Sequence, residues 1–261
     1  MRNRKTARDA MQQTTASLAR LLPQTARPAS GAAAPIRTRS DNMATAFKRS
    51  NPSPRYRELI SQYQQLHLYG DVRRNIPPEK HYDGHALPRH AKSIKALVQH
   101  FKALTILDYG SGKGKQYTQP ITLDDGQRYE SIPEYWDVDS LTCYDPGYEP
   151  FSGLPEGTFD GVISTDVMEH VAEDDLEWVV EEMFSLARKF LFVNAASYEA
   201  FAHLPNGENA HCTVRPVQWW QDLMKRIGAR HPEVRYFMSI DFRDGTPPHY
   251  RDSSPPQLFQ G

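Results

Sequence analysis

The sequence predicts an α/β fold in which helices cover both faces of a mostly parallel sheet. Short apolar segments of strand character lie at 104–108, 140–145, 159–165, 189–194 and 233–242. Segments with apolar residues at helical spacing alternate with these strands, most clearly at 174–188 and 216–227. Gly110, Gly112 and Gly114 follow the first strand at every second position, as in a tight turn from strand to helix. Together these observations indicate a Rossmann-like architecture.

Residues 1–50 form a basic leader rich in Arg, Ala, Ser, Thr and Pro. The leader carries ten Lys or Arg and two Asp residues, a net charge of +8, and shows little periodicity. We expect it to be disordered, because such a composition buries little apolar surface. Two alternatives stay open. Residues 1–42 resemble an organelle transit peptide in being Arg-rich and poor in acids, and translation could instead begin at Met43.

Residues 51–102 are predicted to form an N-terminal helical cap. A first helix is expected at 55–66, where apolar residues recur every three to four positions. A pair of prolines then breaks the chain, and a second amphipathic helix is expected over 88–101. The cap therefore precedes the first strand of the sheet.

The sheet domain is predicted at 103–245. Prolines and an Asp-Gly pair within 118–139 indicate a loop or a short hairpin rather than one long helix. Prolines directly after the second strand leave little room for another helix and strand, so the sheet is expected to be truncated between strands two and four. The Pro-rich end, 246–261, is expected to be irregular.

Composition restricts the partners and the compartment. Residues 51–261 hold 21 basic and 30 acidic residues, a net charge of −9, which argues against nucleic acid as a partner of the folded domain. Cys143 and Cys212 form no Cys-x-x-Cys motif, and we expect a reducing compartment, the cytoplasm. The sequence lacks an apolar segment of the roughly 18–20 residues that span a bilayer, so we expect a soluble protein without a membrane partner.

Acidic side chains and the glycine turn are predicted to converge on one edge of the sheet. Asp108 and Asp145 end the first two strands, and Asp166 follows the third. Ligands of doubly wound sheets bind at the carboxyl ends of the strands. The glycine spacing departs from the Gly-x-Gly-x-x-Gly pattern of dinucleotide sites, which disfavours a pyrophosphate. It suits a ligand with an amino-acid tail and a ribose, whose two hydroxyls could donate to the oxygens of Asp145.

These segments resemble the class I S-adenosylmethionine-dependent methyltransferases. The resemblance covers about residues 80–245 and is carried by Leu107-Asp-Tyr-Gly-Ser-Gly-Lys-Gly114, by Asp145 and by Phe159-Asp-Gly-Val-Ile-Ser-Thr-Asp-Val-Met-Glu-His-Val171. It implies S-adenosylmethionine as the cofactor. The implied cofactor-binding residues are Asp108, Tyr109, Gly110, Ser111, Gly112, Gly114, Asp145, Pro146, Asp166 and Val167. One departure is the position of Asp145, which lies 33 residues after Gly112, where about twenty is usual.

Two histidines are candidate catalytic bases. His170 lies just past the third predicted strand, and His211 lies in a loop after the fourth. Methyl transfer to a hydroxyl requires an aligned acceptor and removal of its proton, and histidine suits proton removal at neutral pH. The alternatives are a packing role for His170 and a pocket-shaping role for His211.

The segment from Asp166 to His170 also resembles the Glu-x-x-Glu-His segment of ubiquinone-pathway O-methyltransferases and of small-RNA 2′-O-methyltransferases. The small-RNA enzymes use such a segment and a later histidine to hold a divalent metal. The resemblance implies Asp166, Glu169, His170 and His211 as metal ligands. Asp166 is one methylene shorter than the glutamate of the family. The alternative is a metal-free pocket in which Asp166 serves the cofactor.

We therefore expect an enzyme that transfers a methyl group from S-adenosylmethionine to an oxygen of a small-molecule acceptor. Two alternatives stay open: a metal-dependent 2′-O-methyltransferase acting on RNA, and a non-catalytic relative that serves as a partner subunit. No motif in the sequence identifies the acceptor or an adenine-binding residue.

Overall fold

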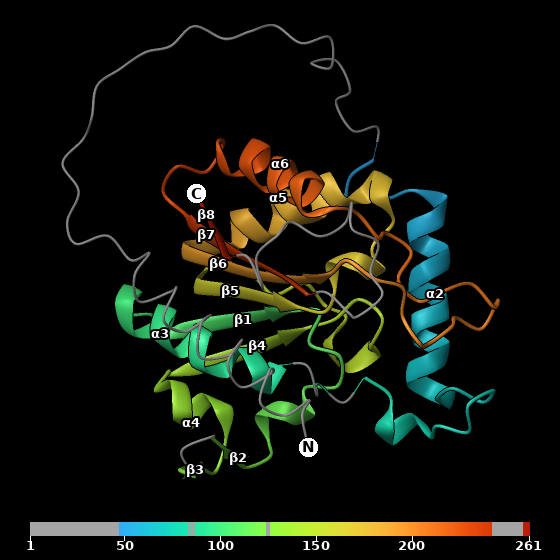
Figure 1. Ribbon diagram of the computed structural model, residues 1–261, viewed down its shortest axis with the longest axis horizontal. Coiled ribbons are helices and arrows are strands. Elements are labelled where there is room, and N and C mark those ends of the chain that lie inside the picture. Colours follow the sequence, from blue (N-terminus) through green and yellow to red (C-terminus); the bar gives the residue numbers. More distant parts are fainter. Residues whose placement is uncertain (1–46, 83, 85–86, 124–125, 242–257) are drawn as a thin grey trace, which may run out of the picture.

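The computed structural model describes residues 47–82, 84, 87–123, 126–241 and 258–261. The predicted leader up to residue 46 and the predicted tail up to residue 257 lie outside these residues. The described chain forms a six-stranded sheet of order β4-β1-β5-β6-β7-β8 between two layers of helices (Figure 1). The neighbouring pairs from β4 to β7 are all parallel. The predicted Rossmann-like α/β fold is therefore confirmed.

Five of the strands correspond to predicted strands, and the sixth was not expected. The strands are β4 (Ser140–Tyr144), β1 (Thr105–Tyr109), β5 (Phe159–Thr165), β6 (Ala187–Ala196), β7 (Arg235–Asp241) and β8 (Leu258–Gln260). The prediction that 246–261 is irregular was wrong for β8, which pairs antiparallel with β7. The outer edge of β7 offers backbone N–H and C=O groups, and a short added strand provides partners for them.

Helices cover the two faces of the sheet. One face carries α3 (Ala91–Phe101) and α4 (Ile132–Trp136), and the other carries α5 (Leu176–Leu186) and α6 (Val217–Gly228) (Figure 1). Residues of α3 pack with Ile106 and Phe192 of the sheet. Helix α3, which was expected in the N-terminal helical cap, therefore packs directly on the sheet. Among the described helices, none is both long and apolar enough to cross a membrane.

The segment 118–139 contains a hairpin and a short helix, as the sequence predicted in part. β2 (Ile121–Thr122) pairs antiparallel with β3 (Arg128–Tyr129), and α4 follows. The side chain of Ser131 caps α4 by accepting from the N–H of Glu134 at 3.2 Å. The indole of Trp136 is fully buried and donates to the carbonyl of Ala91 at 2.9 Å. This bond ties α4 to α3.

The sheet is truncated beside β4, as predicted. Residues 145–158 carry the chain from β4 to β5 and contain one 3₁₀ turn, Glu149–Phe151, with no further strand or α-helix. β4 is consequently an edge strand of the six-stranded sheet. The carboxyl ends of β4 and β1 must therefore be shielded from solvent by residues from elsewhere in the chain.

Residues 47–53 provide part of that cover, although their first four residues were expected in the leader. Phe47 packs against the core of the α5 and α6 face. Arg49 donates to the hydroxyl of Tyr144 at 2.7 Å and forms an ion pair with Glu182 of α5. Its guanidinium also lies 5.4 Å from the centre of the Tyr144 ring. These contacts offset the entropy lost when this segment is ordered.

Helix α2 (Pro54–Tyr69) stands across the carboxyl ends of the strands (Figure 1). Ser53 begins the helix, because its hydroxyl accepts from the N–H of Tyr56 at 2.9 Å. The N–H of Ser53 donates to Asp175 at 3.0 Å, which joins the start of α2 to α5. One side of α2 thereby faces the edge at which ligands of such sheets bind.

We predict that Arg49→Gln lowers the free energy of unfolding by about 1–3 kcal/mol, because it removes charged hydrogen bonds to Glu182 and Tyr144. Denaturation in urea measures the change. The matched control is Lys48→Gln at the exposed neighbouring position. Equal stability of the two variants would contradict the anchoring role of Arg49.

Candidate functional site

A cavity of about 200 Å³ lies between α2 and the carboxyl edge of the sheet. All the predicted cofactor-binding residues except Gly114 line it. They are Asp108, Tyr109, Gly110, Ser111, Gly112, Asp145, Pro146, Asp166 and Val167. The candidate base His170 also lines the cavity, whereas His211 is not among the lining residues. The folded chain thus brings together side chains that the sequence places almost 60 residues apart.

The glycine turn is held against the end of β4. The N–H groups of Gly110 and Ser111 donate to the carbonyl of Tyr144 at 2.7 and 3.0 Å. Gly110 has a φ of 89°, and a Cβ there would lie 2.3 Å from Cγ2 of Val167. This position therefore requires glycine. Gly114 also has a positive φ, 64°, and precedes a 3₁₀ turn, so its role is in the turn rather than in the cavity wall.

Asp145 binds the same turn through its side chain. One carboxylate oxygen accepts from the N–H of Gly112 and the other from the N–H of Gly147, both at 2.8 Å. Burial raises the pKa of Asp145 above its ordinary value, and these N–H groups oppose the rise. The sequence predicted a ribose acceptor here, which stays a prediction; in the structure the carboxylate holds the backbone of the glycine turn. Each oxygen still has a lone pair for a ligand hydroxyl.

Asp108 presents a buried acidic oxygen to the cavity. The hydroxyl of Tyr117 donates to its Oδ2 at 2.7 Å, whereas its Oδ1 accepts no hydrogen bond from the described residues. Burial raises the pKa of Asp108 to about 7. A buried oxygen without a donor is costly, and a ligand ammonium group would provide one.

Asp166 is strained and paired with a cation. Its φ of 61° lies in the left-handed region, which costs a non-glycine residue roughly 1–2 kcal/mol. Its carboxylate lies 3.5 Å from Arg89, which also pairs with Asp241 at 2.9 Å. Although burial raises the pKa of Asp166, Arg89 and His170 bring it below its ordinary value. Asp166 is therefore held ionised directly after the carboxyl end of β5.

Glu169, His170 and His211 form a cluster whose ligand atoms all lie within 4.8 Å of one another. The cluster does not include Asp166, which was predicted as a fourth metal ligand. The Glu169 carboxylate is fully buried, and its Oε1 accepts from the N–H of Ala196 at 3.0 Å. Its Oε2 accepts no hydrogen bond from the described part of the chain. Burial and the nearby Asp166 raise the pKa of Glu169 well above its ordinary value.

The two histidines of this cluster are held in the same tautomer. Nδ1 of His170 lies 2.9 Å from the carbonyl oxygen of Ala210, and Nδ1 of His211 lies 2.6 Å from that of Tyr198. A carbonyl only accepts, so the proton is on Nδ1 and the lone pair is on Nε2. Burial and His211 lower the pKa of His170 to about 4, which keeps its ring neutral. Nε2 of His211 lies 4.0 Å from Oε1 of Glu169, so two acceptor atoms approach each other within the cluster, an arrangement that a cation would complete.

The donor set fits a borderline divalent ion such as zinc. Zinc takes imidazole and carboxylate ligands, and catalytic zinc sites use three protein ligands and one open position. Ligand atoms around a tetrahedral zinc lie about 3.3–3.5 Å apart, so the most widely separated atoms of the cluster would close by up to about 1.5 Å on binding. The observed cluster has three candidate ligands, the number that such a site requires.

The sequence did not identify the wall of the cavity opposite the sheet. Tyr56, Ile60 and Tyr63 of α2 line this wall, together with Tyr82. The helical spacing predicted α2, but an apolar helix face is most often core packing. Only the position of α2 across the strand ends gives these side chains a place at the site (Figure 1).

Comparisons with protein-family models, with curated proteins and with solved structures give no match to this chain. Its function must therefore be inferred from the cavity and the cluster themselves.

We predict that His90 makes stability depend on pH. His90 is 8% exposed, and burial lowers its pKa to about 3, whereas an unfolded histidine titrates near 6.5. The folded state then binds fewer protons, so this stabilisation is present above pH 6.5 and is lost as the pH falls toward 3. From pH 7 to pH 5, the free energy of unfolding of the wild type should fall by about 2 kcal/mol relative to that of His90→Gln. Urea denaturation at both values tests this, and a constant difference would contradict it.

Proposed function

We propose that this protein is an S-adenosylmethionine-dependent methyltransferase that methylates a hydroxyl of a small-molecule acceptor. The observation that supports it best is one cavity lined by Asp108, Asp145 and the turn from Gly110 to Gly112. These groups lie at the carboxyl edge of a Rossmann-like sheet, where nucleoside ligands bind.

The lining residues suit a nucleoside with a cationic amino-acid tail. Asp108 Oδ1 would accept from the ammonium group of the tail, and the oxygens of Asp145 would accept from the ribose hydroxyls. Ile60 and Val167 add apolar surface beside these polar groups. When bound, S-adenosylmethionine supplies a methyl group on a positively charged sulfur, which is already activated for transfer.

The protein would then contribute alignment, exclusion of water and removal of a proton. Helix α2 covers the cavity and keeps water away from the reacting atoms. Transfer of the methyl group from the cofactor's sulfur to the acceptor oxygen would release the hydroxyl proton, and the protein would have to take up that proton. The neutral imidazole of His170 and the imidazole of His211 are the groups that would take the hydroxyl proton.

The cluster of acceptor atoms favours a metal-assisted form of this reaction. Glu169, His170 and His211 would hold a divalent ion such as zinc, and a bound metal acidifies a hydroxyl that it coordinates. In this form the histidines act as ligands rather than as bases. A terminal ribose of RNA is the alternative acceptor that carries such a hydroxyl.

We predict that Asp145→Asn weakens binding of S-adenosylhomocysteine by about 1–3 kcal/mol, or roughly 5- to 150-fold. The substitution keeps the size of the side chain and removes its charge. Isothermal titration calorimetry measures the change, and Asp139→Asn at an exposed position serves as the control. Unchanged affinity would remove Asp145 from the site, and a wild type that binds no nucleoside would contradict the proposed function.

We predict that His211→Ala lowers turnover by about 100-fold or more while cofactor affinity stays within about twofold, because His211 does not line the cavity. Turnover is followed as release of S-adenosylhomocysteine in the presence of a mixture of small hydroxyl compounds. His203→Ala, an exposed position in the same loop, is the control.

The same assay in a chelator separates the two roles of the histidines. If activity is lost in the chelator and restored by zinc, the histidines act as metal ligands. If activity persists in the chelator, they act as bases. Full activity of His211→Ala would exclude both.

A further inference from the structure

Tyr63 belongs to both parts of the candidate site. Its side chain lines the cavity beneath α2, and its ring meets the ring of His170 edge to face, with centres 5.5 Å apart. Its hydroxyl donates to the carbonyl of Ala210 at 3.0 Å and lies 3.1 Å from Nδ1 of His170. One tyrosine therefore touches the cavity and the histidine cluster at the same time.

The Tyr63 hydroxyl closes a triangle of polar atoms behind the cluster. The carbonyl of Ala210 accepts from both the Tyr63 hydroxyl and Nδ1 of His170, the latter at 2.9 Å. Ala210 directly precedes His211 in the chain. The hydroxyl thus contacts the ring of one histidine and the backbone beside the other. A rotation of the His170 ring would break this triangle.

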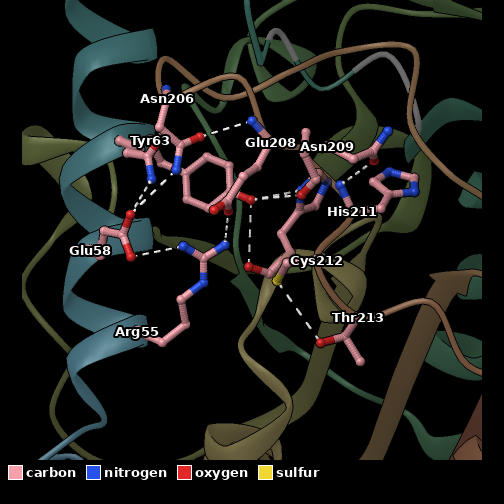
Figure 2. A network of polar contacts seen from close by, with 12 residues as sticks. Arg55, Glu58, Tyr63, Asn206, Glu208, Asn209, His211, Cys212 and Thr213 are labelled. Atoms are coloured by element: carbon pink, nitrogen blue, oxygen red, sulfur yellow. Dashed lines mark hydrogen bonds and ion pairs between the residues drawn. The ribbon is translucent and has the colours of Figure 1, made fainter.

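Helix α2 also holds the loop that leads to His211. The N–H of Asn206 donates to the side chain of Gln62 at 3.1 Å, and Arg55 forms an ion pair with Glu208. Figure 2 shows Arg55 and Glu58 on α2 facing Asn206 and Glu208 on this loop. Contacts along the length of α2 therefore hold the loop that carries His211, and among these contacts the Tyr63 hydroxyl also reaches His170.

We infer that Tyr63 is a positioning residue for the cluster of Glu169, His170 and His211 as a metal site. Its hydroxyl orients the His170 ring and the chain beside His211, while its ring forms part of the cavity wall. This inference rests on the metal-assisted form of the proposed function. Groups that hold the Nδ1 side of a metal-binding histidine typically change metal affinity 10- to 100-fold when removed.

The test is the zinc affinity of the full-length chain with Tyr63→Phe, which keeps the ring and removes only the hydroxyl. We expect binding about 10- to 100-fold weaker than in the wild type, measured by competition with a chromophoric chelator. The visible spectrum of the Co²⁺-loaded protein should also change, because it reports the geometry of the ligands.

Tyr82→Phe is the matched control. Its ring centre lies 6.5 Å from that of His170, and its buried hydroxyl has no hydrogen-bond partner among the described residues. We expect Tyr82→Phe to keep its zinc affinity within about twofold of the wild type. The affinity of Tyr63→Phe for S-adenosylhomocysteine should also be retained, because the ring that lines the cavity remains.

Three results would overturn the inference: wild-type zinc affinity in Tyr63→Phe, an equal loss in both phenylalanine variants, or a wild type that binds no zinc. None of these depends on the nucleoside. Failure of the proposed methyl transfer would appear separately, as absence of S-adenosylhomocysteine binding in the wild type.

Discussion

The candidate site is built around the attachment of the glycine turn to the end of β4. The carbonyl of Tyr144 and the carboxylate of Asp145 accept from consecutive parts of this turn. The turn is thereby held open beside Asp108, and the cavity exists because these backbone groups are already bonded to each other. The Asp145 carboxylate both holds the turn and lines the cavity, so it couples the local fold to the candidate site.

The truncated sheet explains why an N-terminal segment completes the site. The chain returns from β4 to β5 over 145–158 with only a 3₁₀ turn, which leaves the neighbouring face of the sheet short of cover. Arg49 and the residues around it pack there, and α2 continues across the strand ends (Figure 1). The cover is tied to α5 at two points, Glu182 and Asp175. A segment that looks like an accessory in the sequence is therefore part of the cavity wall.

Local patterns predicted the parallel strands and the acids at their ends, because alternating strands and helices leave few other topologies. The same reasoning brought Asp108, Asp145 and Asp166 to one edge. Contacts between residues far apart in the sequence could not be predicted from local patterns. Arg49 and Tyr63 act through partners more than 90 residues away, and nothing in their neighbourhood marks those partners. Asp166 was also predicted as a metal ligand, and that role stays a prediction; in the structure its carboxylate lies 3.5 Å from Arg89.

We propose that the cavity between α2 and the sheet holds a sulfonium nucleoside, with its tail at Asp108 and its ribose at Asp145. The decisive experiment is a crystal structure of the protein soaked with S-adenosylmethionine. We expect an ammonium group within hydrogen-bond distance of Asp108 Oδ1 and ribose hydroxyls within that distance of the Asp145 carboxylate. A nucleoside bound elsewhere, or a cavity that stays closed by the side chains of α2 at saturating concentration, would contradict it.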